Sequence, residues 1–326
     1  MHEFSKSQEV VEPTVDRSIY RHVVELGLVV KDLDQTVNHW ERLGFKNIHR
    51  RGTQNVPDIT YRGKKSALTL KLAEGDIGGV RIKWIEPVKG ISSFDNFLER
   101  HGDGVHHIVY SVKGEEELEN QVEYFRAKGI GILMEALWTG AYNDARSVYL
   151  ETAERGAGIT FALTCDPGVS ASDKGENTEP FNSIAQYAVV ARDLKKTAAF
   201  YESLGFGNVP IDCIDFSNVP ECYYRSNPGK FAIYTNQWRW GSVPFEWIQP
   251  CKGTSVFEEY LNKHGEGIHH LAFTVMDLDK TLKAMAVEVA QSGRFSYQNR
   301  RGRFAYIDME PFGGVMIEFI WREPKD

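Results

Sequence analysis

The chain of 326 residues is longer than one hydrophobic core usually supports, which predicts two domains of about 150 residues each. Hydrophobic residues make up 42% and charged residues 25%, a balance typical of globular proteins. The formal net charge of −7 argues against nucleic acid or an anionic membrane as partner, because both require a basic surface. The one basic cluster, Arg300, Arg301 and Arg303, is interpreted as a solvated loop, with an anion clamp for an acidic substrate as the alternative.

Two features predict a cytoplasmic protein. No apolar run approaches the roughly 18 residues of a membrane-spanning helix, and residues 1–17 are polar without the apolar stretch of a secretion signal. The four cysteines show no C-x-x-C spacing, which indicates reduced, incidental thiols. The expected partner is a small-molecule substrate, and a homodimer is left open.

The predicted elements begin after residues 1–20, which carry no periodicity and are expected to form a flexible arm. Residues 23–30 are rich in Val and Leu and predict a strand. Asp32 then caps a helix predicted over 33–43, and Gly44 ends it. Three further strand segments are predicted around 59–62, 67–72 and 80–85.

The same order of elements restarts three times, with new strands predicted from residues 105, 185 and 268. Asp193 and Asp277 are the predicted caps of the helices in the third and fourth units, and the last helix is predicted to continue to about residue 290. The chain is therefore predicted to have an α+β fold of four βαβββ units.

A repeated stretch relates the two halves of the chain. Residues 101–107 read His-Gly-Asp-Gly-Val-His-His, and residues 264–270 read His-Gly-Glu-Gly-Ile-His-His. Without gaps, the surrounding segments share 13 identities in 30 positions, which indicates a tandem duplication of a two-unit domain. The predicted division is an arm (1–20), an N-terminal domain (21–165), a linker rich in Gly, Ser and Asp (166–180) and a C-terminal domain (181–326).

These motifs resemble the vicinal oxygen chelate superfamily, which includes glyoxalase I, methylmalonyl-CoA epimerase and the extradiol dioxygenases. Each half opens with a strand, an Asp-Leu pair and a helix that ends in Leu-Gly-Phe at 43–45 and 204–206. The Gly-x-Gly-x-His-His strands resemble the methylmalonyl-CoA epimerase branch. The resemblance implies two tandem glyoxalase-like domains, in which two units close a cup of curved sheet and metal ligands come from the first and last strand of each unit.

Placed on these strands, the ligand positions of the C-terminal half combine an imidazole, an amide and two carboxylates. They are Gln186, Glu246, His270 and Glu318. The resemblance implies one divalent metal ion, and such a set suits Zn, Ni, Co, Mn or Fe, with Zn as the first choice. Glu318 lies in the otherwise apolar run 315–321, where an unpaired carboxylate would cost several kcal/mol, so a metal or a catalytic role is the economical interpretation.

The matching positions of the N-terminal half are Glu25, Lys83, His107 and Thr160. A cation at Lys83 would repel a divalent ion, and Thr160 is a poor substitute for a carboxylate, so this half is expected to bind no metal. An exchange of units between the halves would split the four good ligands over two incomplete sites, which favours sequential pairing of the units. His106 and His269 precede the ligand positions and are expected to be structural, with side chains on the opposite face of the sheet.

The resemblance implies a metal-dependent epimerase or isomerase. Such an enzyme removes a proton alpha to a carbonyl of a small hydroxyketone, cyclitol-like or sugar-like, and the metal stabilises the enolate. Relatives of this kind include 2-epi-5-epi-valiolone epimerase. Glu246 and Glu318, on opposing strands, are the predicted catalytic carboxylates, as ligand and base in some combination.

Three alternatives remain open. The first is a lyase of the glyoxalase I type or a methylmalonyl-CoA epimerase. The second is an Fe(II) dioxygenase of the ring-cleaving or 4-hydroxyphenylpyruvate type, which uses two His and one carboxylate and fits Gln186 and Glu246 poorly. The third is a metal-free protein that binds a small molecule.

Overall fold

We describe the protein from a computed structural model that covers residues 18–138, 145–165, 180–207, 210–239, 241, 243–297, 300–309 and 312–324. Most of the predicted arm and nearly all of the predicted linker lie outside these residues. None of the described helices is long and apolar enough to cross a membrane. All four cysteines are free thiols in the structure.

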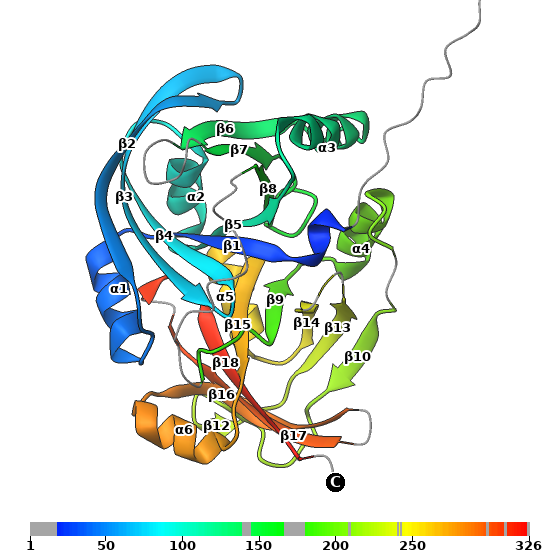
Figure 1. The fold of residues 1–326 in the computed structure, drawn as a ribbon. Coiled ribbons are helices and arrows are strands. Elements are labelled where there is room, and N and C mark those ends of the chain that lie inside the picture. The colour runs from blue at the N-terminus through cyan, green and yellow to red at the C-terminus, as the bar shows by residue number, and fades with distance from the viewer. Residues whose placement is uncertain are drawn as a thin grey trace, which may run out of the picture.

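The N-terminal half contains strands β1 to β8 and three helices, drawn from blue to green in Figure 1. Its elements are a 3-10 turn at Ile19–Arg21, β1 (Val23–Val29), α1 (Leu33–Arg42), β2 (His49–Tyr61), β3 (Lys64–Ile77), β4 (Val80–Lys89), α2 (Ser93–His101), β5 (Gly104–Ser111), α3 (Glu115–Ala127), β6 (Ile132–Trp138), β7 (Ala145–Leu150) and β8 (Thr160–Thr164).

The C-terminal half repeats this order with two additional short strands. Its elements are β9 (Gln186–Val190), α4 (Leu194–Ser203), β10 (Asp212–Asp215), β11 (Tyr223–Tyr224), β12 (Asn227–Pro228), β13 (Ala232–Trp238), β14 (Phe245–Lys252), α5 (Val256–His264), β15 (Gly267–Thr274), α6 (Leu278–Met285), β16 (Val289–Tyr297), β17 (Arg300–Ile307) and β18 (Met316–Arg322).

The predicted helix caps are confirmed. Asp32, Asp193 and Asp277 accept hydrogen bonds from the third main-chain N–H beyond them, at the start of α1, α4 and α6. The prediction that α6 continues to about residue 290 was wrong. The helix ends at Met285 because Ala286 takes the left-handed conformation, with a φ of 51°, and the β-branched Val289 already belongs to β16.

Strand pairing in the two halves is the same. β1 pairs with β4 in parallel and with β5 antiparallel, and β5 pairs with β8 in parallel. In the C-terminal half, β9 pairs with β14 in parallel and with β15 antiparallel, and β15 pairs with β18 in parallel. Each half therefore builds its central strands from its own segments, which confirms sequential pairing.

The two halves are joined at the repeated histidine stretch. β5 meets β15 where Val105 pairs with Ile268. Beside this pair, the ring Nδ1 of His101 donates to the main-chain oxygen of His264 over 2.6 Å, and the Nδ1 of His264 donates to the main-chain oxygen of His101 over 2.5 Å. The first histidine of each repeat thus holds the two halves together at the ends of α2 and α5.

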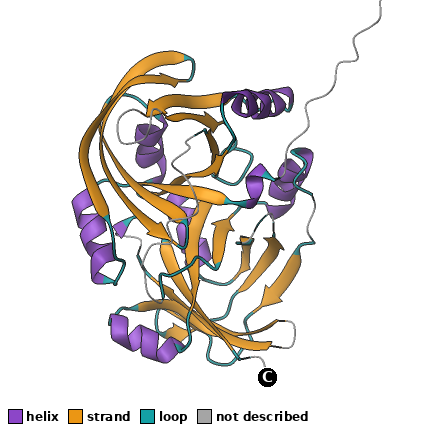
Figure 2. Cartoon of the chain, viewed as in Figure 1, coloured by secondary structure: helices purple, strands orange, loops and turns teal. Residues whose placement is uncertain are grey.

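Apolar side chains form three clusters. The largest extends through both halves and includes the inner faces of α1, α3 and α4, for example Trp40, Phe125 and Tyr201. In Figure 1 and Figure 2, α1, α3, α4 and α6 lie outside the strands, whereas α2 lies within the curve of the N-terminal strands. A second cluster fills the inside of the N-terminal sheet, and a third lines the inside of the C-terminal sheet. The inner surfaces of the two sheets are therefore separate, and each can carry its own chemistry.

Candidate metal centre

The four predicted ligands lie on adjacent strands of the C-terminal sheet. Glu246 on β14 and His270 on β15 are both opposite Ala188 of β9. Gln186 on β9 and Glu318 on β18 are both opposite Ala272 of β15. Since strand residues that pair across a sheet point to the same face, all four side chains are directed to the inside of the C-terminal cup.

Two short contacts join these side chains in pairs. The Nε2 of Gln186 donates a hydrogen bond to the Oε2 of Glu246 over 2.6 Å. The Nε2 of His270 lies 3.3 Å from the Oε2 of Glu318. Gln186, Glu246 and Glu318 line a cavity of about 660 Å³, whereas His270 is fully buried behind it.

Burial makes the charged forms of these groups costly. Burial, together with the charge of Glu318, raises the pKa of Glu246 to about 8. Burial raises the pKa of Glu318 to about 7 against the opposing effect of a hydrogen bond from Tyr306, and burial lowers the pKa of His270 to about 3. The site therefore holds two carboxyl groups whose ionisation requires a nearby positive charge.

His269 fixes the orientation of His270. The pairing of β15 with β9 shifts between Ile268 and His270, so one extra residue bulges from β15 and both imidazoles lie on the same side. Their Nδ1 atoms are 2.8 Å apart, and both rings contact Phe257 and Tyr306. The prediction that His269 points to the opposite face was wrong, because the alternation of side chains holds only for a regular strand.

The bond between the two imidazoles bears on metal binding. One of the two Nδ1 atoms must carry the hydrogen. When it resides on His270, the Nε2 of His270 keeps a free lone pair directed at Glu318, which is the form that a metal requires. His269 therefore acts on the site through His270.

The residues present fit a divalent cation. The Nε2 of His270 and the Oε2 of Glu318 are buried and have no hydrogen-bond partner in the described part of the chain. An imidazole, an amide oxygen and two carboxylates suit Zn, Ni, Co, Mn or Fe. Within that same part, no three His, Cys, Asp or Glu side chains already converge on one point, so Gln186 would have to release Glu246 and turn its oxygen toward the ion.

In the N-terminal half, cationic side chains of the protein neutralise the buried carboxylate. The Nζ of Lys83 lies 2.9 Å from the Oε2 of Glu25, and Arg81 approaches the same oxygen to 3.3 Å. Burial by itself would raise the pKa of Glu25, but Lys83, His107 and Arg81 hold it far below its usual range. The Lys83 ammonium is buried against the ring of Trp138, 5.0 Å from its centre, and supplies the positive charge of this half.

The strand register corrects one predicted equivalence. Thr160 is opposite His107, just as Met316 is opposite His270. The residue that matches Glu318 is Ala162, because Ala162 pairs with Tyr149 as Glu318 pairs with Tyr306. Alignment on the apolar runs failed because the C-terminal run begins at Val315, two residues before Ile317. Ala162 offers no donor at all, which strengthens the argument against a metal in this half.

The prediction that the His106 side chain lies on the opposite face of the sheet was also wrong. A shift in pairing between β1 and β5 makes a second bulge, so His106 and His107 lie on the same side with their Nδ1 atoms 2.9 Å apart. The two bulges occupy matching positions of the repeat. The paired histidine is thus a conserved feature of the duplication within this chain, whereas the partner of the second histidine differs between the halves.

Arginines around the C-terminal cavity were largely missed. Its lining includes Arg239, Arg294, Arg300 and Arg322. Arg322 follows Glu318 at the same-face spacing of four residues on β18, a signal that strand alternation contains. The predicted solvated loop around Arg300 is instead part of β17, where Arg301 pairs with Glu323 and Arg303 with Asp279, and only Arg300 of the three lines this cavity.

The chain belongs to the Glyoxalase/Bleomycin resistance protein/Dioxygenase superfamily, whose sequence profile matches residues 25–149 and 185–306. It consists of two tandem glyoxalase-like domains, as the resemblance implied. A protein of Bacillus subtilis, the uncharacterised YqjC, is 26% identical over 147 residues, which are 44% of this chain and 94% of YqjC. That relative corresponds in length to one half of this chain.

Solved structures share the fold of the whole chain. A triple mutant of 4-hydroxymandelate synthase from Streptomyces coelicolor has a TM-score of 0.57 at 15% identity, with 94% of both chains covered. A Mn(II)-bound glyoxalase from Novosphingobium aromaticivorans has a TM-score of 0.50 at 12% identity, covering 92% of this chain and 82% of that one. A fusion of a xylose isomerase-like barrel with a 4-hydroxyphenylpyruvate dioxygenase has a TM-score of 0.50 at 16% identity, and the match spans 94% of this chain and 49% of the fusion.

Proposed function

We propose that the protein is a metal-dependent epimerase or isomerase that moves a proton at the carbon next to a carbonyl group of a small hydroxyketone. The observation that carries this proposal is the pair of orphaned buried atoms, His270 Nε2 and Glu318 Oε2, which lie 3.3 Å apart beside the open cavity. The proposal rests on the interpretation of each half as two βαβββ units.

In this proposal His270, Glu318 and Gln186 hold the ion, and Glu246 moves the proton. Glu246 lines the cavity and is kept in place by Gln186 and by Thr235, whose hydroxyl donates to its Oε1 over 3.3 Å. A divalent metal, when bound, would polarise the carbonyl oxygen and favour loss of the neighbouring proton. Tyr306 is paired with Glu318 across β17 and β18 and orients that carboxylate through the hydrogen bond it donates.

The arginines of the cavity favour a substrate with negative charge. Arg322 is partly buried, with its guanidinium carbon 5.7 Å from the ring centre of Phe295, and it is close enough to Arg239 and Arg300 to feel their charges. Three cations at one opening raise the local concentration of anions and match a carboxylate or phosphate group. The preferred substrate is therefore a cyclitol-like or sugar-like hydroxyketone that carries such a group.

The test is proton exchange in heavy water. Protein loaded with Zn, Mn, Co, Ni or Fe is incubated with phosphorylated and unphosphorylated α-hydroxyketones, and deuterium at the carbon next to the carbonyl is followed by NMR. Glu246→Gln is expected to abolish exchange while the protein still binds metal, because only the proton carrier is lost. Glu123→Gln makes the same change at an exposed position of α3 and is the control, which is expected to keep full exchange. Exchange that survives in Glu246→Gln would contradict the proposal.

The alternative of an Fe(II) dioxygenase receives no support from the donor set. Two His and one carboxylate are typical of such sites, whereas this site has one imidazole, one amide and two carboxylates. The fold likeness to 4-hydroxymandelate synthase is at 15% identity and concerns the fold only. Oxygen uptake that depends on Fe(II) and a 2-oxo acid would favour the dioxygenase instead.

A further inference from the structure

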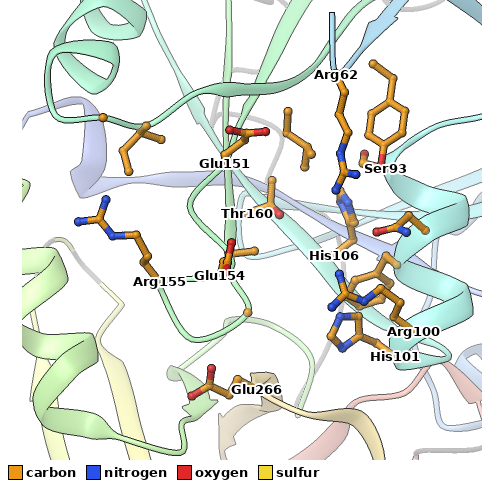
Figure 3. Close-up of a pocket in the computed structure, with 18 of the residues that line it drawn as sticks. Arg62, Ser93, Arg100, His101, His106, Glu151, Glu154, Arg155, Thr160 and Glu266 are labelled. Carbon is orange, nitrogen blue, oxygen red and sulfur yellow. The ribbon is translucent and has the colours of Figure 1, made fainter. Parts of the chain in front are cut away.

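A second cavity, of about 600 Å³, lies in the N-terminal half where it faces the C-terminal half (Figure 3). One wall comes from α2 and from the turn after β2, and the other from the segment that joins β7 to β8. Arg192 and Glu266 of the C-terminal half complete the lining. The cavity is separate from the candidate metal centre, because the two share no lining residue.

Two arginines on one wall of this cavity lack a carboxylate partner. Arg62 and Arg100 take part in no ion pair or hydrogen bond of their side chains within the described residues. In Figure 3, both side chains lie on the wall that also carries His106 and His101, and Glu151 lies across the cavity from Arg62. By contrast, Arg192 already donates to the main-chain oxygen of Leu261 over 3.0 Å.

In the C-terminal half, the equivalent arginine is paired with acidic side chains. Arg225 is the repeat partner of Arg62, and both have the left-handed conformation, with φ values of 46° and 48°. Arg225 forms ion pairs of 3.0 Å with Glu259 and 3.0 Å with Asp308. The residue of the N-terminal half that matches Glu259 is Asn96, which lines the second cavity and carries no charge.

Two other positions have diverged in the same place. Ser93 and Thr160 line the second cavity and are buried, with 4% and 3% of their surface exposed. Their counterparts in the C-terminal half are the apolar Val256 and Met316. Thus, around one cavity, the N-terminal half lacks one of the two acids that pair with the arginine and has buried hydroxyl groups where the C-terminal half has apolar side chains. The second acid is kept, because Glu151 occupies the position of Asp308, but Glu151 forms no ion pair with Arg62 in the described residues.

We propose that this second cavity binds a small organic anion, a carboxylate or a phosphate ester, at a site separate from the metal centre. Arg62 and Arg100 contact the negative group, since guanidinium forks match the geometry of both carboxylate and phosphate. Asn96, Ser93 and Thr160 supply neutral hydrogen-bonding groups for the remainder of the ligand. The cavity is large enough for a ligand well beyond the size of inorganic phosphate.

The most informative variant introduces at Asn96 the acid that the C-terminal half has at Glu259. Asn96→Glu places a carboxylate where Glu259 clamps Arg225, and Arg62→Gln removes the cation directly. Binding of inorganic phosphate and of citrate to the full chain is measured by calorimetry, so that the two arms separate phosphate from carboxylate recognition. Both variants are expected to bind the preferred probe at least about tenfold more weakly than the unchanged protein. Arg126→Gln, on the outside of α3, is the matched control and is expected to bind normally.

A second variant separates this site from the arginines of the C-terminal cavity. Arg322→Gln is expected to leave the binding that depends on Arg62 unchanged. The proposal is overturned if neither probe binds saturably, if Asn96→Glu and Arg62→Gln bind as well as the unchanged protein, or if only Arg322→Gln loses binding. Failure here leaves the proposed reaction intact, because the exchange assay reports on Glu246 and the metal alone.

Discussion

The two halves of this chain have equivalent central strands, but they differ in how the charge of a buried carboxylate is neutralised. In the N-terminal half, Lys83 neutralises the buried Glu25 from within the protein. In the C-terminal half, Glu246 occupies the position of Lys83, and no cation of the protein lies within ion-pair distance of it or of Glu318 in the described residues, His270 excepted. A buried carboxylate requires a positive charge, so the exchange of one lysine for one glutamate converts a closed ion pair into a site for an external cation.

The space inside the two sheets differs accordingly. In the N-terminal half, Met134, Trp138 and Tyr149 belong to a continuous apolar cluster around the Glu25–Lys83 pair. In the C-terminal half, the matching region opens into the cavity of about 660 Å³. The comparison teaches that the space beside the matching positions Lys83 and Glu246 can be either filled or open, and that proton transfer is expected only beside Glu246.

The largest expected effect is on stability, when the buried ion pair of the N-terminal half is disrupted. Lys83→Met removes the buried cation and leaves Glu25 with Arg81 as its remaining ion-pair partner, so the free energy of unfolding is expected to fall by about 3 kcal/mol. Urea unfolding at pH 7 measures the loss. The double variant Glu25→Gln with Lys83→Met removes both charges and is expected to recover most of the stability. A single variant as stable as the unchanged protein would show that Lys83 does not neutralise Glu25.

A smaller effect concerns the pH dependence of the C-terminal site. Because the folded pKa values of Glu246 and Glu318, about 8 and about 7, lie above their usual 4.5, the metal-free folded protein holds protons that the unfolded chain releases. Above about pH 6.5 the buried histidines are neutral in both states, so the free energy of unfolding is expected to fall as the pH rises from 6.5 to 8, on the order of 2 kcal/mol since Glu246 is partly exposed.

Added divalent metal reverses this trend, because the ion replaces the protons. Thermal unfolding of chelator-treated protein at pH 6.5 and pH 8, with and without added Zn, is the measurement. Stability that rises with pH in the absence of metal would contradict the account. The pair Glu25 and Lys83 gives the opposite sign, because the depressed pKa of Glu25 favours the folded state above its usual pKa, and that contribution is lost only in acid.

The smallest of these effects concerns His269. The substitution His269→Gln removes the imidazole that pairs with His270. Metal affinity is expected to fall about tenfold, which is a loss of about 1.4 kcal/mol in binding free energy. The matched variant His106→Gln changes the same position of the other half and is expected to leave metal affinity unchanged. Competition with a metal-binding dye measures both, with thermal midpoints as a check on folding. Equal losses in the two variants would mean that His269 has a structural role only.

Much of the fold followed from local signals in the sequence. The capping aspartates at 32, 193 and 277 each mark the start of a helix that the structure contains, since a cap requires only a few neighbouring residues. The duplicated Gly-x-Gly-x-His-His stretch marked β5 and β15, and Glu318 was conspicuous as a lone carboxylate in an apolar run. These features depend on chain neighbours, which a sequence displays directly.

The errors arose where a position depends on the neighbouring strand. The bulge that turns His269 toward His270 is defined only by the register of β15 against β9. The assignment of Thr160 in place of Ala162 was a two-residue error of register on β8. Arg62, in the turn after β2, and Asn96, on α2, line the same cavity. No local pattern in the sequence predicts that these two segments lie together.

The metal content of each chain tests the asymmetry of the two halves most directly. Purified protein, reconstituted with a single divalent metal and then dialysed, is analysed by plasma emission spectroscopy alongside Glu318→Gln and the exposed control Glu123→Gln. The account predicts one ion per chain in the unchanged protein and in Glu123→Gln, and essentially none in Glu318→Gln. Two ions per chain, or one ion that persists in Glu318→Gln, would contradict the claim that only the C-terminal half binds a metal.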